Sequence, residues 1–161
     1  MLHKFFNTDE SFTALIIRLT LGLVLLPHGL QKLIGAFGGS GFTATMDAMT
    51  GMGLPAIVVF LIIIAESFGS LSLILGFGTR FSALSITLIM IGAFFIHLPN
   101  GFFMNWFGAQ SGEGFEYHLL ATGLGIASLI SGGGKFSLDK VIASVIKRNK
   151  ISEKNIINQT A

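Results

Sequence analysis

Several ionisable side chains lie inside or at the ends of long apolar runs, where a charge needs a partner or water: Arg18, His28, Lys32, Glu66, His97, Glu116 and His118. A charged group in the hydrocarbon of a bilayer is costly, so each of these is a candidate for function. Glu66 is the only charged residue between Leu54 and Phe77, which predicts that it is protonated or paired with a cation. Carboxyl and imidazole groups can exchange protons with a bound ligand or polarise its carbonyl oxygen.

The stretch LLPHGLQKLIG at residues 25–35 places polar groups at the end of the first apolar run. His28 and Lys32 are four residues apart and share a helix face, with Gln31 beside them. The proline of this stretch removes a backbone donor and predicts a kink. The glycine after His28 lets a neighbouring helix or a ligand come close. Two simpler interpretations stay open: Lys32 anchors the helix at the membrane surface, and His28 is hydrogen-bonded across helices.

We predict a polar pocket in the outer half of the membrane with Glu66 at its floor. Glu66 and His28 would be catalytic, and the ligand-binding residues would be Arg18, His28, Gln31, Lys32, Glu66, His97, Glu116 and His118. Arg18 lies about 8 Å from Glu66 in depth at a rise of ~1.5 Å per residue, so we expect the two to pair. That pair would either tune the chemistry or only lock two helices together. No single helix carries a HxxxH or ExxH pair, so we expect neither metal nor haem.

Four apolar segments would position these residues, at about 12–34, 54–77, 81–98 and 115–130. Only 11% of the residues are charged, against roughly 25% in a soluble domain. Segments of about 20 apolar residues are long enough to span a bilayer as helices. The predicted fold class is therefore an all-α membrane protein, a bundle of four transmembrane helices. No signal-peptide cleavage site follows the first segment, so we expect it to stay in the mature chain.

The polar segments predict the topology. Lys4, Arg80 and the basic cluster from Lys135 onward fall on one side of a four-helix arrangement, so we expect both termini in the cytoplasm. Apolar residues at 138, 141, 142, 145 and 146 form a helical stripe, which predicts a C-terminal amphipathic helix in the membrane interface; a soluble helix packed on a partner is the alternative. This gives a transmembrane domain at 1–134 and a helix with a polar tail at 135–161. Residues 36–55 form either a short interfacial helix or a loop.

The absence of cysteine excludes disulfides, thiol relays and Cys-ligated clusters. No basic block is interleaved with aromatic residues, so nucleic-acid binding is not expected. The expected partners are the lipid bilayer, other membrane or periplasmic subunits, and further copies of the chain.

Three pieces of sequence, in order, resemble the DoxX family of small four-helix membrane proteins. They are RLTLGLVLLPHGLQKL, AESFGSLSLILGFGTR and EYHLLATGLGIASLISGGGKFSLD, which together cover about residues 15–139. The resemblance implies a four-helix bundle in the bacterial inner membrane and an association with quinone-linked or sulfur-linked redox systems. Arg18, His28, Lys32, Glu66 and Glu116 correspond to the family's polar positions. The sequence departs from the family pattern at Pro27 and at GGGK.

We therefore expect a quinone-linked or redox-accessory subunit, with quinone as the cofactor that the pocket would suit. His28 and Lys32 would bind a carbonyl oxygen, Glu66 would exchange the proton, and Arg18 would set the pKa of Glu66. Two other functions stay open. The chain could be a non-catalytic assembly subunit of a larger membrane complex, or a small-solute transporter with Glu66 on its pathway. Whether the protein is an enzyme is left open by the sequence.

Overall fold

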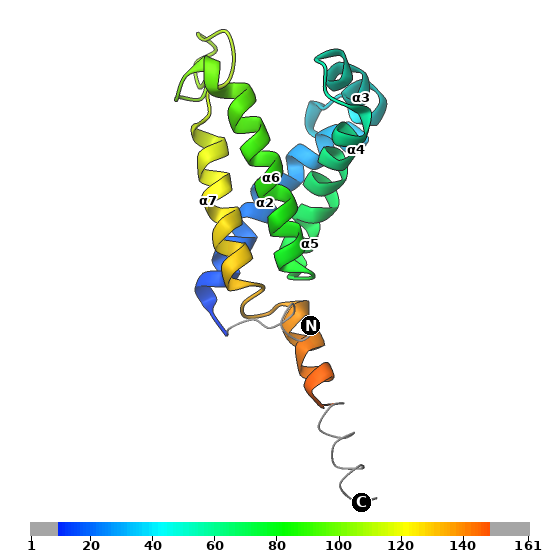
Figure 1. Cartoon of the computed structure of the whole chain (residues 1–161), viewed down its shortest axis with the longest axis vertical. Helices are drawn as coiled ribbons and strands as arrows, with labels where there is room; N and C mark the ends of the chain where they lie inside the picture. Colours follow the sequence, from blue (N-terminus) through cyan, green and yellow to red (C-terminus); the bar gives the residue numbers. More distant parts are fainter. Residues whose placement is uncertain (1–9, 149–161) are drawn as a thin grey trace, which may run out of the picture.

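The computed structural model describes residues 10–148, and every regular element in that range is helical (Figure 1). In chain order the elements are α2 (Phe12–Ile34), the 3-10 turn η1 (Ala36–Gly38), α3 (Gly41–Gly51), α4 (Ala56–Ile64), the π-helical turn η2 (Ala65–Gly69), α5 (Ser70–Leu75), α6 (Thr79–His97), the 3-10 turn η3 (Leu98–Asn100) and α7 (Glu116–Ser131). Residues 138–148 are also helical. The short helix expected as one alternative within 36–55 is present as α3.

Three helices are long and apolar enough to cross a membrane: α2, the continuous helix from Ala56 to Leu75, and α6 with η3 from Thr79 to Asn100. The first has the bounds predicted from the sequence, and the other two begin within two residues of theirs. The expected fourth span is the helix α7, but its 16 residues fall short of the roughly 20 that a span needs. The crossing of the membrane by α7 therefore stays a prediction.

The long helices pack side by side and diverge at one end (Figure 1). α2 packs along α5 and η2 on one side and along α7 on the other, and α7 packs along α6. At one end, here the loop end, lie α3 and the loop of residues 101–115 between η3 and α7. At the other, the tail end, lie the tight turn between α5 and α6 and the helix of residues 138–148. α4 leans away from α6 toward the loop end, so the bundle is closed at the tail end and open at the loop end.

Small residues set the distance between α2 and the α4–α5 helix. A Cβ atom added to Gly22 would lie 2.9 Å from the Ser70 carbonyl oxygen, and one added to Gly29 would lie 2.4 Å from that of Glu66. Both contacts are with backbone, so the helices touch where these glycines lie. Gly125 packs in the same way against Thr87 on α6, whereas Gly123 has open space. Close packing between helices thus occurs at Gly22, Gly29 and Gly125 but not at Gly123.

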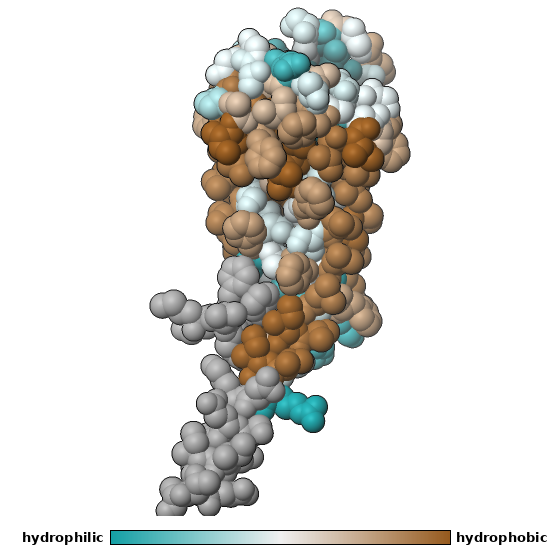
Figure 2. Space-filling model, turned by 90° about the vertical axis from the view of Figure 1, so that its right-hand side faces the viewer, coloured by the Kyte–Doolittle hydropathy of each residue, from teal (hydrophilic) through white to brown (hydrophobic). Residues whose placement is uncertain are grey.

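Large apolar side chains cover the outside of the helices, as expected for contact with lipid. Figure 2 shows brown, hydrophobic atoms around the middle of the molecule and hydrophilic atoms at the loop end. Exposed residues of this kind occur on all the long helices, among them Ile16, Leu61, Leu88 and Leu120. A water-soluble protein rarely exposes one continuous apolar surface of this size. The surface therefore supports placement in a membrane.

Arg18 locks the tail end, and this role was not predicted. Its guanidinium donates five hydrogen bonds to backbone carbonyls, at 2.7 Å to Leu73, 2.6 Å to Ile74, 2.7 Å to Gly133, 3.3 Å to Lys135 and 3.0 Å to Phe136. The first two carbonyls lie in the last turn of α5, where a helix has no donors of its own. Arg18 thus joins α2, the end of α5 and the turn after α7. It is 1% exposed and uses all five of its N–H groups.

Asp139 forms a second connection at the tail end. Its carboxylate accepts hydrogen bonds from the Gly78 amide at 2.6 Å and the Thr79 amide at 2.9 Å. These amides belong to the first turn of α6, where a carboxylate also interacts favourably with the helix dipole. Asp139 therefore caps α6 from the helix of residues 138–148. Ser137 does cap its own helix, accepting from the Lys140 amide at 3.2 Å.

Asp139→Asn should destabilise the protein by about 1–2 kcal/mol, because the amide keeps one acceptor and loses the charge. The measurement is the temperature at which the detergent-purified protein loses its monodisperse elution peak. Asp47→Asn is the matched control, since Asp47 is exposed on α3 and accepts no hydrogen bond through its side chain within residues 10–148. Equal unfolding temperatures for the two variants would contradict the capping role.

Candidate functional site

Glu66 is buried and forms an ion pair with Lys32. The Lys32 ammonium donates to Oε2 of Glu66, and the two side chains are 26% and 7% exposed. The expected partner, Arg18, instead binds the five carbonyls at the tail end, so the prediction of an Arg18–Glu66 pair is wrong. The reason is register: Gly29 abuts the backbone of Glu66, and Lys32 follows it by about one helical turn on the same side. Lys32 therefore reaches inward and is more than a surface anchor.

Glu66 lies in the π-helical turn η2, from Ala65 to Gly69. A π turn widens the helix by one residue and is frequent at functional sites. The turn sits opposite the segment of α2 that contains Pro27 and Gly29, and α2 stays helical throughout that segment. Two neighbouring hydroxyls, those of Ser67 and Ser70, are buried without a hydrogen-bond partner within residues 10–148. The carboxylate thus lies among polar groups inside the bundle.

Four rings form a continuous row beside this ion pair. The His97 and His118 rings stack with centroids 4.5 Å apart, the Tyr117 ring lies 5.4 Å from His118, and His28 lies 5.9 Å from Tyr117. His97 bonds through Nδ1 to the Glu113 carbonyl at 3.0 Å; since a carbonyl only accepts, Nδ1 carries the proton. The row leads from the loop end toward the Tyr117 hydroxyl, which lies within electrostatic range of Glu66.

One polar atom in the row is buried and has no hydrogen-bond partner within residues 10–148, namely the Tyr117 hydroxyl. Buried polar atoms are rarely left without a partner, so such atoms point to a ligand or water in the site. Tyr117 was not among the residues predicted for the site. The available signal was its position next to His118, on an otherwise apolar helix.

The remaining predicted residues are not part of this group. Glu116 accepts hydrogen bonds from the Met104 amide and from the Trp106 indole, both at 3.0 Å, and so holds the loop of residues 101–115. Gln31 donates to the Phe37 carbonyl at 3.2 Å, in the turn that follows α2. Arg18, Glu116 and Gln31 thus each bind another part of the chain and do not join the group around Glu66. The structure brings together His28, Lys32, Glu66, His97 and His118, with Tyr117 added.

Two hollows border the site. An apolar groove of about 190 Å³ runs between α2 and α7, from Tyr117 past Val24 to Thr20 and Leu124. A more polar cavity of about 400 Å³ lies between the end of α2 and α3, with Lys32 on its wall. The ion pair therefore lies between an apolar groove and a polar cavity.

The geometry suits proton exchange and hydrogen bonding to a carbonyl oxygen. A carboxylate paired with an ammonium, near a phenol and two imidazoles, can take up or release a proton as a ligand binds. Within residues 10–148, no three His, Asp or Glu side chains are arranged to hold a metal ion. The fold and these groups define a small all-helical membrane protein with a buried ion pair and a row of rings in one half.

Comparison with known proteins gives the family. The family model described as DoxX matches residues 13–99, more than half of the chain, and the chain belongs to the DoxX family. The protein named "Putative oxidoreductase CatD" of Bacillus subtilis (strain 168) is 26% identical over 146 residues, covering 91% of this chain and 98% of that protein. The "Inner membrane protein YqjF" of Escherichia coli (strain K12) is 25% identical over 134 residues, covering 83% and 94%. No solved structure matches the chain.

Proposed function

We propose that this DoxX-family membrane protein is a quinone-linked redox-accessory subunit whose site is the Lys32–Glu66 pair with His28 and Tyr117. The observation that carries the proposal is the buried Tyr117 hydroxyl, which lacks a partner within the described residues and belongs to a residue that lines the apolar groove and lies beside His28. A quinone has the matching chemistry, because its carbonyl oxygens accept hydrogen bonds and its tail is apolar. The relative named an oxidoreductase agrees with this class of function.

In this proposal the tail of the quinone lies in the groove between α2 and α7, and its ring lies beside Tyr117 and His28. The Tyr117 hydroxyl donates to one carbonyl oxygen, and Glu66 supplies a proton as the ring is reduced. Lys32, and not Arg18, is the cation paired with Glu66. Reduction to the quinol takes two electrons and two protons, so the Glu66 carboxylate takes up each proton from water and passes it to the ring in turn. The sequence has no cysteine, so the electrons come from a partner protein or from a cofactor bound to this chain.

The charges favour one orientation. Arg80, Lys135, Lys140, Lys147 and Arg148 all belong to the tail end, so the positive-inside rule puts that end and both termini in the cytoplasm. α7 then crosses the membrane as the fourth span, and the helix of residues 138–148 lies in the cytoplasmic interface. The protein is in this view a multi-pass protein of the bacterial inner membrane, with its site in the outer half.

The test uses the protein purified in mild detergent. Its visible spectrum is recorded, and small molecules are then extracted from it and identified by mass spectrometry. We expect close to one quinone per chain, and at least tenfold less in Tyr117→Phe, which keeps the ring and removes only the hydroxyl. Glu66→Gln should retain the quinone and the fold but abolish turnover in the native membrane complex. A colourless wild-type protein that carries only phospholipid, or normal turnover in Glu66→Gln, would contradict the proposal.

The exposed aromatic residues at the loop end favour a second candidate function, that of an assembly subunit. Phe103, Trp106 and Phe107 are 66%, 77% and 96% exposed. Aromatic residues are common both in membrane interfaces and at the centres of protein interfaces. This function predicts a stoichiometric partner that is lost on Trp106→Ala and retained in Glu66→Gln. If the partner protein were lost only when Lys32 or Glu66 is changed, and not in Trp106→Ala, the quinone proposal would be favoured.

A further inference from the structure

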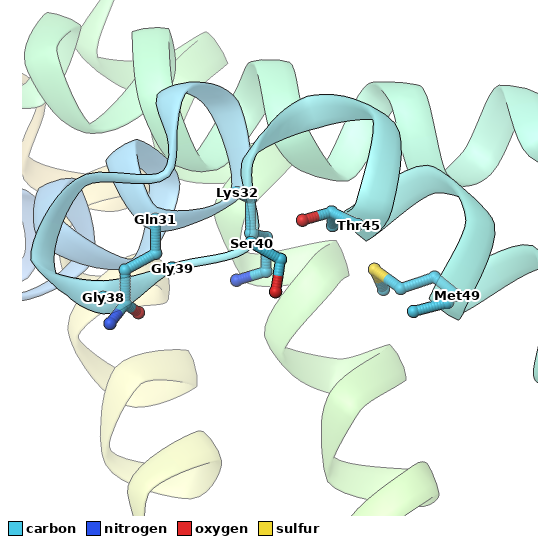
Figure 3. A pocket seen from close by; sticks show the side chains of 8 residues that line it. Gln31, Lys32, Gly38, Gly39, Ser40, Thr45 and Met49 are labelled. Atoms are coloured by element: carbon cyan, nitrogen blue, oxygen red, sulfur yellow. The ribbon is translucent and has the colours of Figure 1, made fainter.

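The polar cavity between the end of α2 and α3 has the donors for an anion and no acid on its wall. It measures about 400 Å³, within the roughly 300–1,000 Å³ of small-molecule sites. Figure 3 shows the side chains of Gln31, Lys32, Ser40 and Thr45 around it, with Met49 at one edge. Lys32 brings a positive charge, and the other three can donate hydrogen bonds. None of the wall residues that the structure describes is Asp or Glu.

The Thr45 side chain points to a ligand. Thr45 is 9% exposed, and its oxygen is directed toward Ser40 in the cavity (Figure 3). Elsewhere on α3, Thr50 bonds back to the Met46 carbonyl, but the Thr45 hydroxyl makes no hydrogen bond within residues 10–148. The residue as a whole is nearly buried while its oxygen is not fully enclosed, so the hydroxyl opens onto the cavity. The partner it lacks would have to come from the cavity.

Two further features favour a negatively charged ligand. Ser40 precedes the first turn of α3, and its side chain caps none of the amides of that turn, so the positive end of the helix dipole is left for another acceptor. Gln31 uses its amide nitrogen toward the Phe37 carbonyl and keeps a second N–H. Ammonium, hydroxyl and amide donors around one cavity match the oxygen atoms of a phosphate group.

We propose that this cavity binds a phosphate group, carried by a phospholipid headgroup or free in solution. A phospholipid fits the surroundings, because the adjacent residues Ile34, Phe37 and Phe42 are 68%, 69% and 37% exposed and offer an apolar surface for acyl chains. The site does not depend on the proposed quinone function, since it shares no lining residue with the groove between α2 and α7.

Lys32 belongs to both proposed sites, so changes at Glu66 should alter phosphate binding in a predictable direction. Its ammonium is paired with Glu66 while it also lines the cavity. A phosphate in the cavity therefore competes with the Glu66 carboxylate for the same cation. Removing the charge of Glu66 should make Lys32 more available and strengthen phosphate binding. Removing the charge of Lys32 should weaken it.

The experiment uses the delipidated full chain in mild detergent with three probes: dioleoylphosphatidylglycerol, dioleoylglycerol, which has the same chains without the phosphate, and inorganic phosphate. Lipid binding is followed by native mass spectrometry and phosphate binding by calorimetry. We expect saturable phosphatidylglycerol binding that dioleoylglycerol does not reproduce. The affinity for phosphatidylglycerol should fall about tenfold or more in Lys32→Gln, because this change removes a charge-assisted contact. It should fall about three- to tenfold in Thr45→Val, because this change removes a neutral hydrogen bond.

Glu66→Gln should bind the probe several-fold more tightly. Lys140→Gln should bind as the wild type does, because it removes a positive charge at the tail end, where Lys140 pairs with Glu10. Unchanged elution and unfolding temperature of Thr45→Val will show that a loss of affinity is not a loss of fold. Saturation by inorganic phosphate alone would assign the site to the free ion. Saturation by neither phosphate probe, equal binding of dioleoylglycerol, or equal affinity in Lys32→Gln would overturn the proposal.

Discussion

Arg18→Gln is expected to lower the free energy of unfolding by about 3–5 kcal/mol, the range for breaking a buried charged contact. The variant leaves most of the five carbonyls that Arg18 now binds without a donor, and a buried polar group without a partner costs about 1–3 kcal/mol. The unfolding temperature in detergent should fall by roughly 10 °C or more. The protein should also accumulate poorly in the membrane.

Arg18→Lys separates the charge from the geometry. Lysine keeps the charge but has three donors in place of five, so it should restore part of the stability. Arg148→Gln is the control, since Arg148 is exposed on the helix of residues 138–148. Full stability in Arg18→Gln would show that the connection among α2, α5 and the turn after α7 is dispensable. Full rescue by lysine would show that charge alone matters.

Gly29→Ala is expected to destabilise the protein by about 3 kcal/mol, at the upper end of the usual range for overpacking. The added methyl would lie 2.4 Å from the Glu66 carbonyl oxygen and 2.5 Å from the Ser67 amide nitrogen. Both are backbone atoms of η2 and cannot rotate away. The helices must separate, which also moves Glu66 relative to Lys32. The measurement is the unfolding temperature, together with the quinone content if the site holds a quinone.

Gly123→Ala is the matched control on α7, because an added Cβ there meets no atom within 4 Å. The glycine-to-alanine change by itself favours a helix by up to about 1 kcal/mol, so this variant should be unchanged or slightly more stable. If Gly29→Ala behaved in the same way, the close contact between α2 and η2 would not determine the stability of the bundle.

The Glu66→Gln and Lys32→Gln variants should have opposite effects at the two sites. In the quinone proposal both impair turnover, because both alter proton exchange at the same carboxylate. In the phosphate proposal Glu66→Gln raises the affinity for the phosphate probe and Lys32→Gln lowers it. Measurements on the same two variants therefore distinguish failure of one proposal from failure of the other.

The sequence by itself determined the class of protein and the helices. The low content of charge and the lengths of the apolar runs predicted an all-helical membrane protein, and α2 has the predicted bounds. These features are local, since burial of apolar runs in lipid and hydrogen bonding within each helix act on one segment at a time. For the same reason the burial of Glu66 could be inferred, whereas the roles of His28 and Lys32 stay predictions. The ligand, the partner and the crossing of the membrane by α7 stay predictions.

Only the tertiary structure decided which groups meet. Depth along separate helices suggested Arg18 as the partner of Glu66, but the contact of Gly29 with η2 sets the register and puts Lys32 there. The partners of Arg18 are backbone carbonyls, which every residue carries, so no side-chain pattern could identify them. The π turn around Glu66 and the position of Tyr117 beside His28 likewise depend on packing between helices. Contacts between segments are set by register and tilt, and a single sequence specifies neither directly.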